Sequence, residues 1–135
     1  MILLDTDVMI DLLRQYPPAM QWLDTLDEEE EIALPGFVVM ELVQGCRSKQ
    51  EQQRLLQVLD PYAVVWLSPN ECEIALQNFI QFHLSHHIGI MDVLVAQTAI
   101  ALKVPLYTFN QKHYQCIPDL LTIQPYQKPI DGQEG

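Results

Sequence analysis

Short, continuous apolar runs separated by longer segments with helical periodicity are the feature that most constrains how this chain folds. The runs fall at residues 2–4, 32–34, 63–67, 104–107 and 120–123. Apolar runs of this length are typical of strands buried on both faces, and strands that alternate with helices form a mostly parallel sheet. We therefore predict an α/β fold of three layers, in which helices cover both faces of a mostly parallel central sheet of four to five strands.

Helices are predicted between these strands. Thr6 or Asp7 is expected to cap the first helix through a side-chain oxygen, and Pro17-Pro18 is expected to end it and open the second. The inward faces are expected to include Met20 on the second helix and Leu56 on the fourth. The longer helices are predicted over residues 37–46, 49–59, 71–86 and 91–103.

The length of 135 residues and the 49% share of hydrophobic residues suit one domain with a packed core. We assign the domain to residues 1–125 and expect a loose polar tail over residues 126–135. The 18 acidic residues outnumber the 7 basic ones, for a net charge of −11, which argues against nucleic-acid binding through a broad basic surface. A nuclease whose charge is locally inverted by bound cations stays open.

Targeting and redox signals indicate the cytoplasm. Met1 leads directly into an apolar run without a basic segment or cleavage site, so no signal peptide is expected. No apolar run approaches the ~18 residues that a membrane span requires, so no membrane association is expected. Cys46, Cys72 and Cys116 lie far apart without CxxC spacing, which suits a reducing compartment better than a disulfide framework.

Three acidic residues stand in apolar surroundings. Asp5 ends an apolar strand, Glu41 lies within residues 38–43, and Asp92 lies within residues 88–95. A buried carboxylate costs several kcal/mol unless it is hydrogen-bonded, paired or bound to a metal. Because the chain has only 7 lysines and arginines, a cation from solution is a serious candidate for the missing partner.

Topology places several oxygen-bearing side chains at one edge of the predicted sheet. Asp5 and Asp7 follow the first strand, and Thr108 and Asn110 follow the strand at 104–107. In open parallel sheets the functional crevice lies beyond the carboxyl ends of the strands, and hard oxygen ligands suit Mg²⁺ or Mn²⁺. Helix capping is the alternative role for the aspartates.

Four segments in order resemble the PIN-domain nucleases, especially the VapC-type toxins of bacterial toxin–antitoxin pairs. No single segment is specific, but their order and spacing cover the chain from residue 2 to about 125. The matching segments are Leu3-Leu4-Asp5-Thr6-Asp7-Val8, Glu41-Leu42-Val43-Gln44-Gly45, Asp92-Val93-Leu94-Val95-Ala96-Gln97-Thr98-Ala99 and Tyr107-Thr108-Phe109-Asn110-Gln111-Lys112-His113-Tyr114.

The resemblance implies a PIN-like fold and a metal-dependent ribonuclease. Asp5, Glu41 and Asp92 fall on the family's most regular acidic positions and would hold Mg²⁺ or Mn²⁺. Asn110 falls where many members carry a fourth acid, and it joins the three acids as a catalytic candidate. His113 falls where an aspartate is common, so the resemblance leaves one or two metal ions open.

Further candidate residues surround this set. Asp7, Thr6 and Thr108 form a secondary group that would ligate metal or orient water and phosphate by hydrogen bonds. The candidates for contacts with the RNA backbone are Arg14, Arg47, Lys49 and Lys112, although solvated surface cations are the alternative interpretation.

The resemblance also implies partners: an RNA substrate, a VapB-like antitoxin and a second copy of the chain in a homodimer. The acidic run at residues 27–31 is expected to be a solvated loop. A PIN-fold RNA-binding or scaffold protein with weak catalysis, or a housekeeping RNA-processing nuclease, is the alternative function.

Two other site types are disfavoured. A haloacid-dehalogenase-type phosphatase needs a threonine where this chain has Met9. His83, His86 and His87 lack cysteine or glutamate at zinc-ligand spacing and are expected on the surface.

Overall fold

Five parallel strands form one sheet in the order β3-β2-β1-β4-β5. The structure, a computed structural model, describes residues 1–129. The predicted α/β class with a parallel central sheet is confirmed. The strands are β1 (Ile2–Leu4), β2 (Ile32–Pro35), β3 (Ala63–Val65), β4 (Leu106–Tyr107) and β5 (Thr122–Ile123).

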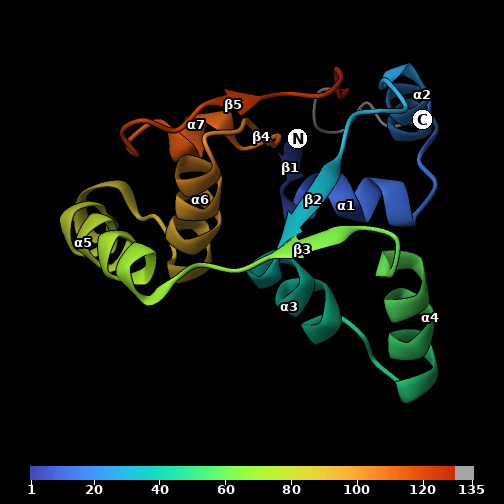
Figure 1. Cartoon of the computed structure of the whole chain (residues 1–135), viewed down its shortest axis with the longest axis horizontal. Helices are drawn as coiled ribbons and strands as arrows, with labels where there is room; N and C mark the ends of the chain where they lie inside the picture. Colours follow the sequence, from blue (N-terminus) through green and yellow to red (C-terminus); the bar gives the residue numbers. More distant parts are fainter. Residues whose placement is uncertain (130–135) are drawn as a thin grey trace.

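Seven helices within residues 1–129 connect the strands. Figure 1 shows α1 to α4 to the right of and below the strands, and α5 to α7 to their left. The strand order explains this division, because right-handed crossovers that step in opposite directions along a sheet place their helices on opposite faces. The helices are α1 (Thr6–Leu13), α2 (Pro17–Thr25), α3 (Gly36–Gln44), α4 (Lys49–Leu59), α5 (Pro69–His86), α6 (Ile90–Leu102) and α7 (Gln111–Tyr114).

The strands β2 and β3 add to one side of β1, and the strands β4 and β5 add to its other side. The candidate site lies at the boundary between β1 and β4. The two strands pair in parallel with Leu4 beside Tyr107, so Asp5 and Thr108 leave the sheet side by side. The Asp5 amide continues the pairing and donates to the Tyr107 carbonyl at 2.9 Å. Because the chain leaves these two strands toward opposite faces, a crevice opens at their carboxyl ends.

The local predictions need three corrections. Asp5, rather than Thr6 or Asp7, caps α1: its backbone is extended and its Oδ1 accepts from the Thr6 amide at 2.8 Å. Met20 is 36% exposed because α2 buries only the stripe containing Ala19. Leu56 is 47% exposed because α4 turns other positions toward the core.

The strand ends also differ slightly from prediction. β3 stops at Val65 because its partner β2 ends at Pro35, the residue paired with it. β4 begins after Pro105, since proline has no amide hydrogen to donate to a neighbouring strand. The acidic run at 27–31 is a loop, as predicted, and Glu30 pairs with the amino terminus of Met1 at 3.0 Å.

The segment after Pro125 is packed as far as the structure describes it. The Tyr126 hydroxyl donates to Asp11 Oδ2 at 2.6 Å, and Lys128 Nζ lies 2.8 Å from the same oxygen and over the Phe109 ring. The expectation of a loose tail is therefore wrong for residues 126–129, and residues 130–135 lie outside the described residues. The division between domain and tail at residue 125 stays a prediction.

The three cysteines are unpaired. Over residues 1–129, none of the helices combines the length and apolar character that crossing a membrane requires.

Candidate active site

Asp5 forms the buried centre of the site. Its side chain is held at both oxygens: Oδ1 accepts from the Thr6 amide at 2.8 Å, and Oδ2 accepts from the Thr108 hydroxyl at 2.9 Å and the Tyr114 hydroxyl at 3.0 Å. Asp5 is only 8% exposed, and Thr108 and Tyr114 are buried with it. The donors come from α1, from the end of β4 and from α7, so three separate elements fix one carboxylate.

Asp92 lies at the start of α6 and joins the same group. Its Oδ2 accepts from the Gly89 amide at 3.2 Å and lies 2.8 Å from His113 Nε2. Its Oδ1 lies 3.4 Å from the Tyr114 hydroxyl. The Tyr114 hydroxyl therefore stands between Asp5 and Asp92, with the shorter distance to Asp5.

Asp7 ties α1 to the segment that follows β4. Its Oδ1 accepts from the Val8 amide at 2.8 Å, and its Oδ2 accepts from the Phe109 amide at 3.0 Å. The Thr108 hydroxyl lies 3.4 Å from the same Oδ2. Both carboxylate oxygens of Asp7 are thus engaged by backbone amides.

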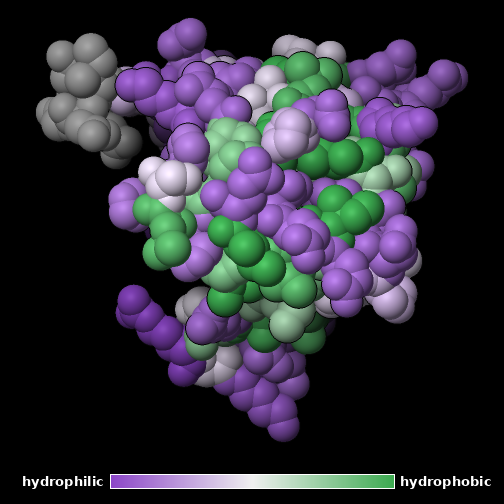
Figure 2. Space-filling view, turned by 90° about the vertical axis from the view of Figure 1, so that its left-hand side faces the viewer, coloured by the Kyte–Doolittle hydropathy of each residue, from purple (hydrophilic) through white to green (hydrophobic). Residues whose placement is uncertain are grey.

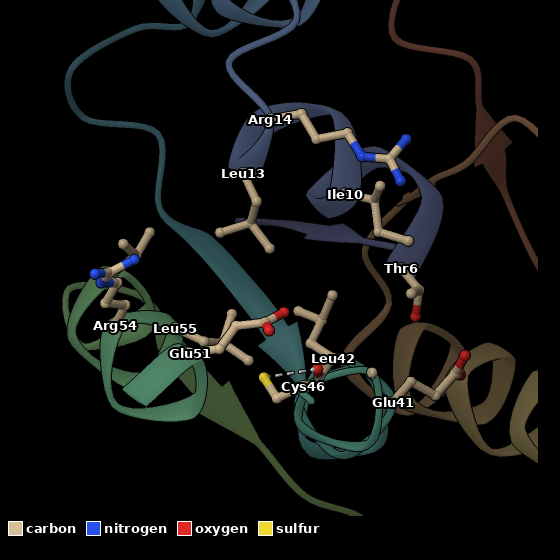
Figure 3. A pocket seen from close by; sticks show the side chains of 12 residues that line it. Thr6, Ile10, Leu13, Arg14, Glu41, Leu42, Cys46, Glu51, Arg54 and Leu55 are labelled. Carbon is tan, nitrogen blue, oxygen red and sulfur yellow. Dashed lines mark hydrogen bonds between the residues drawn. The ribbon is translucent and has the colours of Figure 1, made fainter. Parts of the chain in front are cut away.

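Glu41 lies on α3, at the rim of a pocket of about 490 Å³ between α1, α3 and α4. Figure 3 shows its carboxylate turned out of α3 toward the side on which Thr6 lies. The Thr6 hydroxyl is buried and has no hydrogen-bond partner among the described residues. The pocket floor is apolar, with Ile10, Leu42 and Leu55 among its lining residues.

The negative charges of the site's acids repel one another, and burial makes each charge more costly. Burial, and to a smaller extent Asp92, raises the pKa of Asp5. Burial, followed by the charges of Asp5 and Asp92, raises the pKa of Glu41. Burial and the Asp5 charge raise the pKa of Asp7 to about 6. Burial and the same acids raise the pKa of Tyr114, which keeps its hydroxyl protonated as a donor.

The donor set suits a hard divalent cation. Asp5, Glu41 and Asp92 offer carboxylate oxygens, the ligands that Mg²⁺ and Mn²⁺ prefer. No lysine or arginine within residues 1–129 forms a salt bridge with any of these three acids. In the described residues, however, no three metal-ligating side chains converge closely enough to hold an ion as they stand. The structure joins Asp5 and Asp92 through Tyr114 and leaves Glu41 outside that hydrogen-bonded group.

The other predicted residues are more dispersed. The Asn110 side chain is exposed, and its backbone amide donates to the Thr108 hydroxyl at 3.0 Å. Arg14 lines the same pocket as Glu41, from the C-terminal end of α1. The remaining cations, Arg47, Lys49 and Lys112, are exposed on the loop before α4, the first turn of α4, and α7.

The disfavoured zinc site gains no support from the structure. The His83 ring stacks on Phe79, and His86 lies edge-on to Phe82 and within 2.7 Å of the Ser85 hydroxyl. Together with His87 these residues form no metal-ligating group in the described part of the chain.

Sequence reasoning missed Tyr114 and Arg54. Tyr114 closes the last of the four motif segments, but an aromatic residue there is read as core, and only the fold shows that its hydroxyl reaches two acids. Arg54 lies on the charged, glutamine-rich α4 and lines the side of the pocket away from Glu41 (Figure 3). Its spacing along α4 gives no signal that it faces the pocket.

Comparison with known proteins identifies the family. A profile of the PIN domain matches residues 2–116. The chain belongs to the PIN domain family. It is 36% identical over 127 residues to the ribonuclease VapC19 of Mycobacterium tuberculosis, an alignment that covers 89% of this chain and 97% of that protein.

Solved structures agree with this assignment. The VapBC2 complex of Rickettsia felis, bound to a DNA fragment from its promoter, contains a chain with a TM-score of 0.74 and 27% identity, over 91% of this chain and 98% of that chain. A toxin–antitoxin complex from Klebsiella pneumoniae matches with a TM-score of 0.72 and 22% identity, over 95% and 100% of the two chains. The second similarity supports the fold.

Proposed function

We propose that this protein is a Mg²⁺- or Mn²⁺-dependent endoribonuclease that hydrolyses RNA phosphodiester bonds and is the toxin of a VapBC-type toxin–antitoxin pair. The observation that carries the proposal is the hydrogen-bonded group of Asp5, Asp92 and Tyr114 at the carboxyl edge of the sheet, with Glu41 nearby. Similarity to a ribonuclease over nearly the whole chain supports the reaction class. We further propose a cytoplasmic location, where the protein would meet an RNA substrate.

We assign the residues of the site different roles in hydrolysis. Asp5, Asp92 and Glu41 would hold the metal, and the Glu41 side chain would have to turn toward the other two. When bound, the ion lowers the pKa of water and offsets the charge that builds on the phosphate. Glu41, the acid outside the hydrogen-bonded group, accepts a proton from the attacking water. Thr108 fixes Asp5, and the exposed Asn110 carboxamide orients the phosphate.

Cations around the site contact the RNA backbone. Arg14 lines the same pocket as Glu41. Arg47, Lys49 and Lys112 are exposed on the loop before α4, on the first turn of α4 and on α7. Each phosphate contact that is lost flattens the salt dependence of RNA binding. These few local cations compensate for the overall acidity of the chain.

The antitoxin partner is supported by the neighbouring structures, which are toxin–antitoxin complexes. We place a segment of the partner in the pocket between α1, α3 and α4, because its floor is apolar and it opens beside Glu41. The toxin assignment predicts an adjacent gene for a small DNA-binding protein that co-purifies with this chain. A housekeeping nuclease would have no such neighbour.

A homodimer is the assembly we propose, and the outer face of α5 supports it. Leu76, Ile80 and Leu84 are 47%, 58% and 79% exposed and recur every fourth residue along one side of the helix. Figure 2, which views the molecule from the side on which α5 lies, shows hydrophobic side chains at the surface between hydrophilic ones. Two antiparallel copies centred on Ile80 place Glu73 of one chain opposite His87 of the other. Replacing Ile80 with Asp should leave a monomer in light scattering, whereas an unchanged mass would exclude this face.

The nuclease proposal is tested with the purified chain and total RNA. We expect cleavage with Mn²⁺ or Mg²⁺ that stops with EDTA and in the Asp92→Asn variant, whose fold is checked by circular dichroism. Metal binding without cleavage of any RNA fraction would favour the RNA-binding or scaffold alternative. Metal-independent cleavage would contradict the proposed chemistry.

A further inference from the structure

We infer that His113 restricts the site to one divalent ion per chain, by occupying the Asp92 oxygen that a second ion would need. The inference rests on the proposed function and specifies its metal stoichiometry. The observation behind it is that the two carboxylate oxygens of Asp92 have unequal surroundings.

The two carboxylate oxygens of Asp92 have different hydrogen-bond partners. Oδ2 lies 2.8 Å from His113 Nε2 and also accepts from the Gly89 amide at 3.2 Å. Oδ1 lies 3.4 Å from the Tyr114 hydroxyl, a weak contact, on the side that faces Asp5. Oδ1 is therefore the oxygen of Asp92 that would be available to an ion.

A second ion would need Oδ2. Enzymes that use two metals hold them about 3.5–4 Å apart, bridged or flanked by carboxylates. At Asp92 the position beside Oδ2 is filled by the His113 ring, and both side chains are about one-third exposed, at 33% and 32%. The imidazole blocks this place and is itself a poor ligand for Mg²⁺.

No nearby acid replaces the lost oxygen. The Asp7 carboxylate is directed to other partners than Asp92: its two oxygens accept from the Val8 and Phe109 amides, at 2.8 and 3.0 Å. Asn110 carries a neutral carboxamide and is exposed. Glu41, the remaining acid of the site, is already required for the first ion. His113 is thus a positioning residue that holds Asp92 and closes the second metal position.

The test counts bound ions without using activity. The purified chain is titrated with Mn²⁺, and the free ion is measured by its electron paramagnetic resonance signal. We expect one Mn²⁺ per chain for the wild type and two for His113→Asp, which frees Oδ2 and adds a carboxylate. The matched control is Lys112→Asp, which adds a carboxylate one residue earlier on α7, makes the chain more negative than His113→Asp does, and should stay at one ion. Thermal melts in EDTA confirm that each variant is folded.

The outcomes separate this inference from the proposed function. Two ions on the wild type, or one ion on a folded His113→Asp chain, would overturn the role of His113 and leave the nuclease proposal standing. No Mn²⁺ bound to the wild type would overturn the metal-dependent function and the inference with it. A second ion on the Lys112→Asp control would attribute the effect to charge alone and contradict the inference.

Discussion

The inner and outer halves of the site are built differently. In the inner half, Asp5, Thr108 and Tyr114 are buried, and both Asp5 oxygens are hydrogen-bonded by the chain itself. In the outer half, Glu41 and His113 are partly exposed and Asn110 is exposed. Strand register fixes the inner half, since Asp5 and Thr108 follow paired residues of β1 and β4. The outer half depends on single side chains of α3 and of the segment after β4.

This difference indicates which property each half controls. Changes in the inner half must alter the stability of the fold and the binding of the metal together, because burial makes each lost hydrogen bond costly. Changes in the outer half can alter chemistry or metal count while the fold persists.

Glu41→Gln should give the largest effect that leaves the fold intact. The amide cannot accept a proton from water, so RNA cleavage should fall on the order of 100-fold or more. The melting temperature in EDTA should not fall, because glutamine keeps the shape of glutamate and removes a charge that Asp5 and Asp92 repel. Glu51→Gln, in the same pocket, is the control. Equal cleavage by Glu41→Gln and wild type would remove Glu41 from the mechanism.

Tyr114→Phe should weaken the inner half. Loss of the hydroxyl removes a donor from a buried carboxylate, so the free energy of unfolding in EDTA should fall by about 1–2 kcal/mol. Urea denaturation measures this change. Tyr62→Phe removes a hydroxyl that contacts neither Asp5 nor Asp92 and should cost less. The distinction between the halves fails if both variants lose the same stability.

The stability of the metal-free protein should depend on the pH through Asp7. Its pKa is raised from 3.8 to about 6, so the folded state binds this proton more tightly than the unfolded chain. The contribution is therefore favourable below pH 3.8 and is lost as the pH rises through about 6. Wild type should lose about 1 kcal/mol more than Asp7→Asn across this window, after allowance for partial exposure.

Urea denaturation at several pH values, in EDTA, gives this difference. Asp24→Asn, at an exposed position on α2, should keep the wild-type slope. An identical pH profile for the wild type and Asp7→Asn would show that Asp7 titrates alike in the folded and unfolded states.

Asn110→Asp should have the smallest effect. The added carboxylate is exposed, and the Asp92 oxygen beside His113 stays occupied, so one Mn²⁺ per chain should still bind. Cleavage should change by less than about tenfold, since the residue lies outside the hydrogen-bonded group. A second bound Mn²⁺ in this variant would assign the metal count to position 110 instead of 113.

The sequence predicts the scaffold well because periodicity and helix signals are local. The helix at 49–59 has the predicted bounds. Asp5 caps α1, Asp92 lies in the first turn of α6, and Glu41 lies midway along α3. Burial of single helix positions is less predictable. Met20 and Leu56 fit an apolar stripe, yet they are exposed because it is the packing of neighbouring helices that decides which part of a stripe is covered.

Contacts between distant residues were beyond sequence reasoning. The Tyr114 hydroxyl reaches Asp5 across 109 positions of the chain, and an aromatic residue gives no sign of whether its hydroxyl or its ring is used. Tyr126 similarly packs against Asp11 although its segment is polar. Both interactions follow from the order of the strands, which periodicity alone does not determine.

The most direct test of the central claim is an Mn²⁺ titration of the wild type and Asp5→Asn, with melting temperature and RNA cleavage recorded together. The account predicts that Mn²⁺ raises the melting temperature and starts cleavage in the wild type, and that the folded Asp5→Asn chain shows neither response. Cleavage by Asp5→Asn at the wild-type rate, or a wild type indifferent to Mn²⁺ in both measurements, would contradict it.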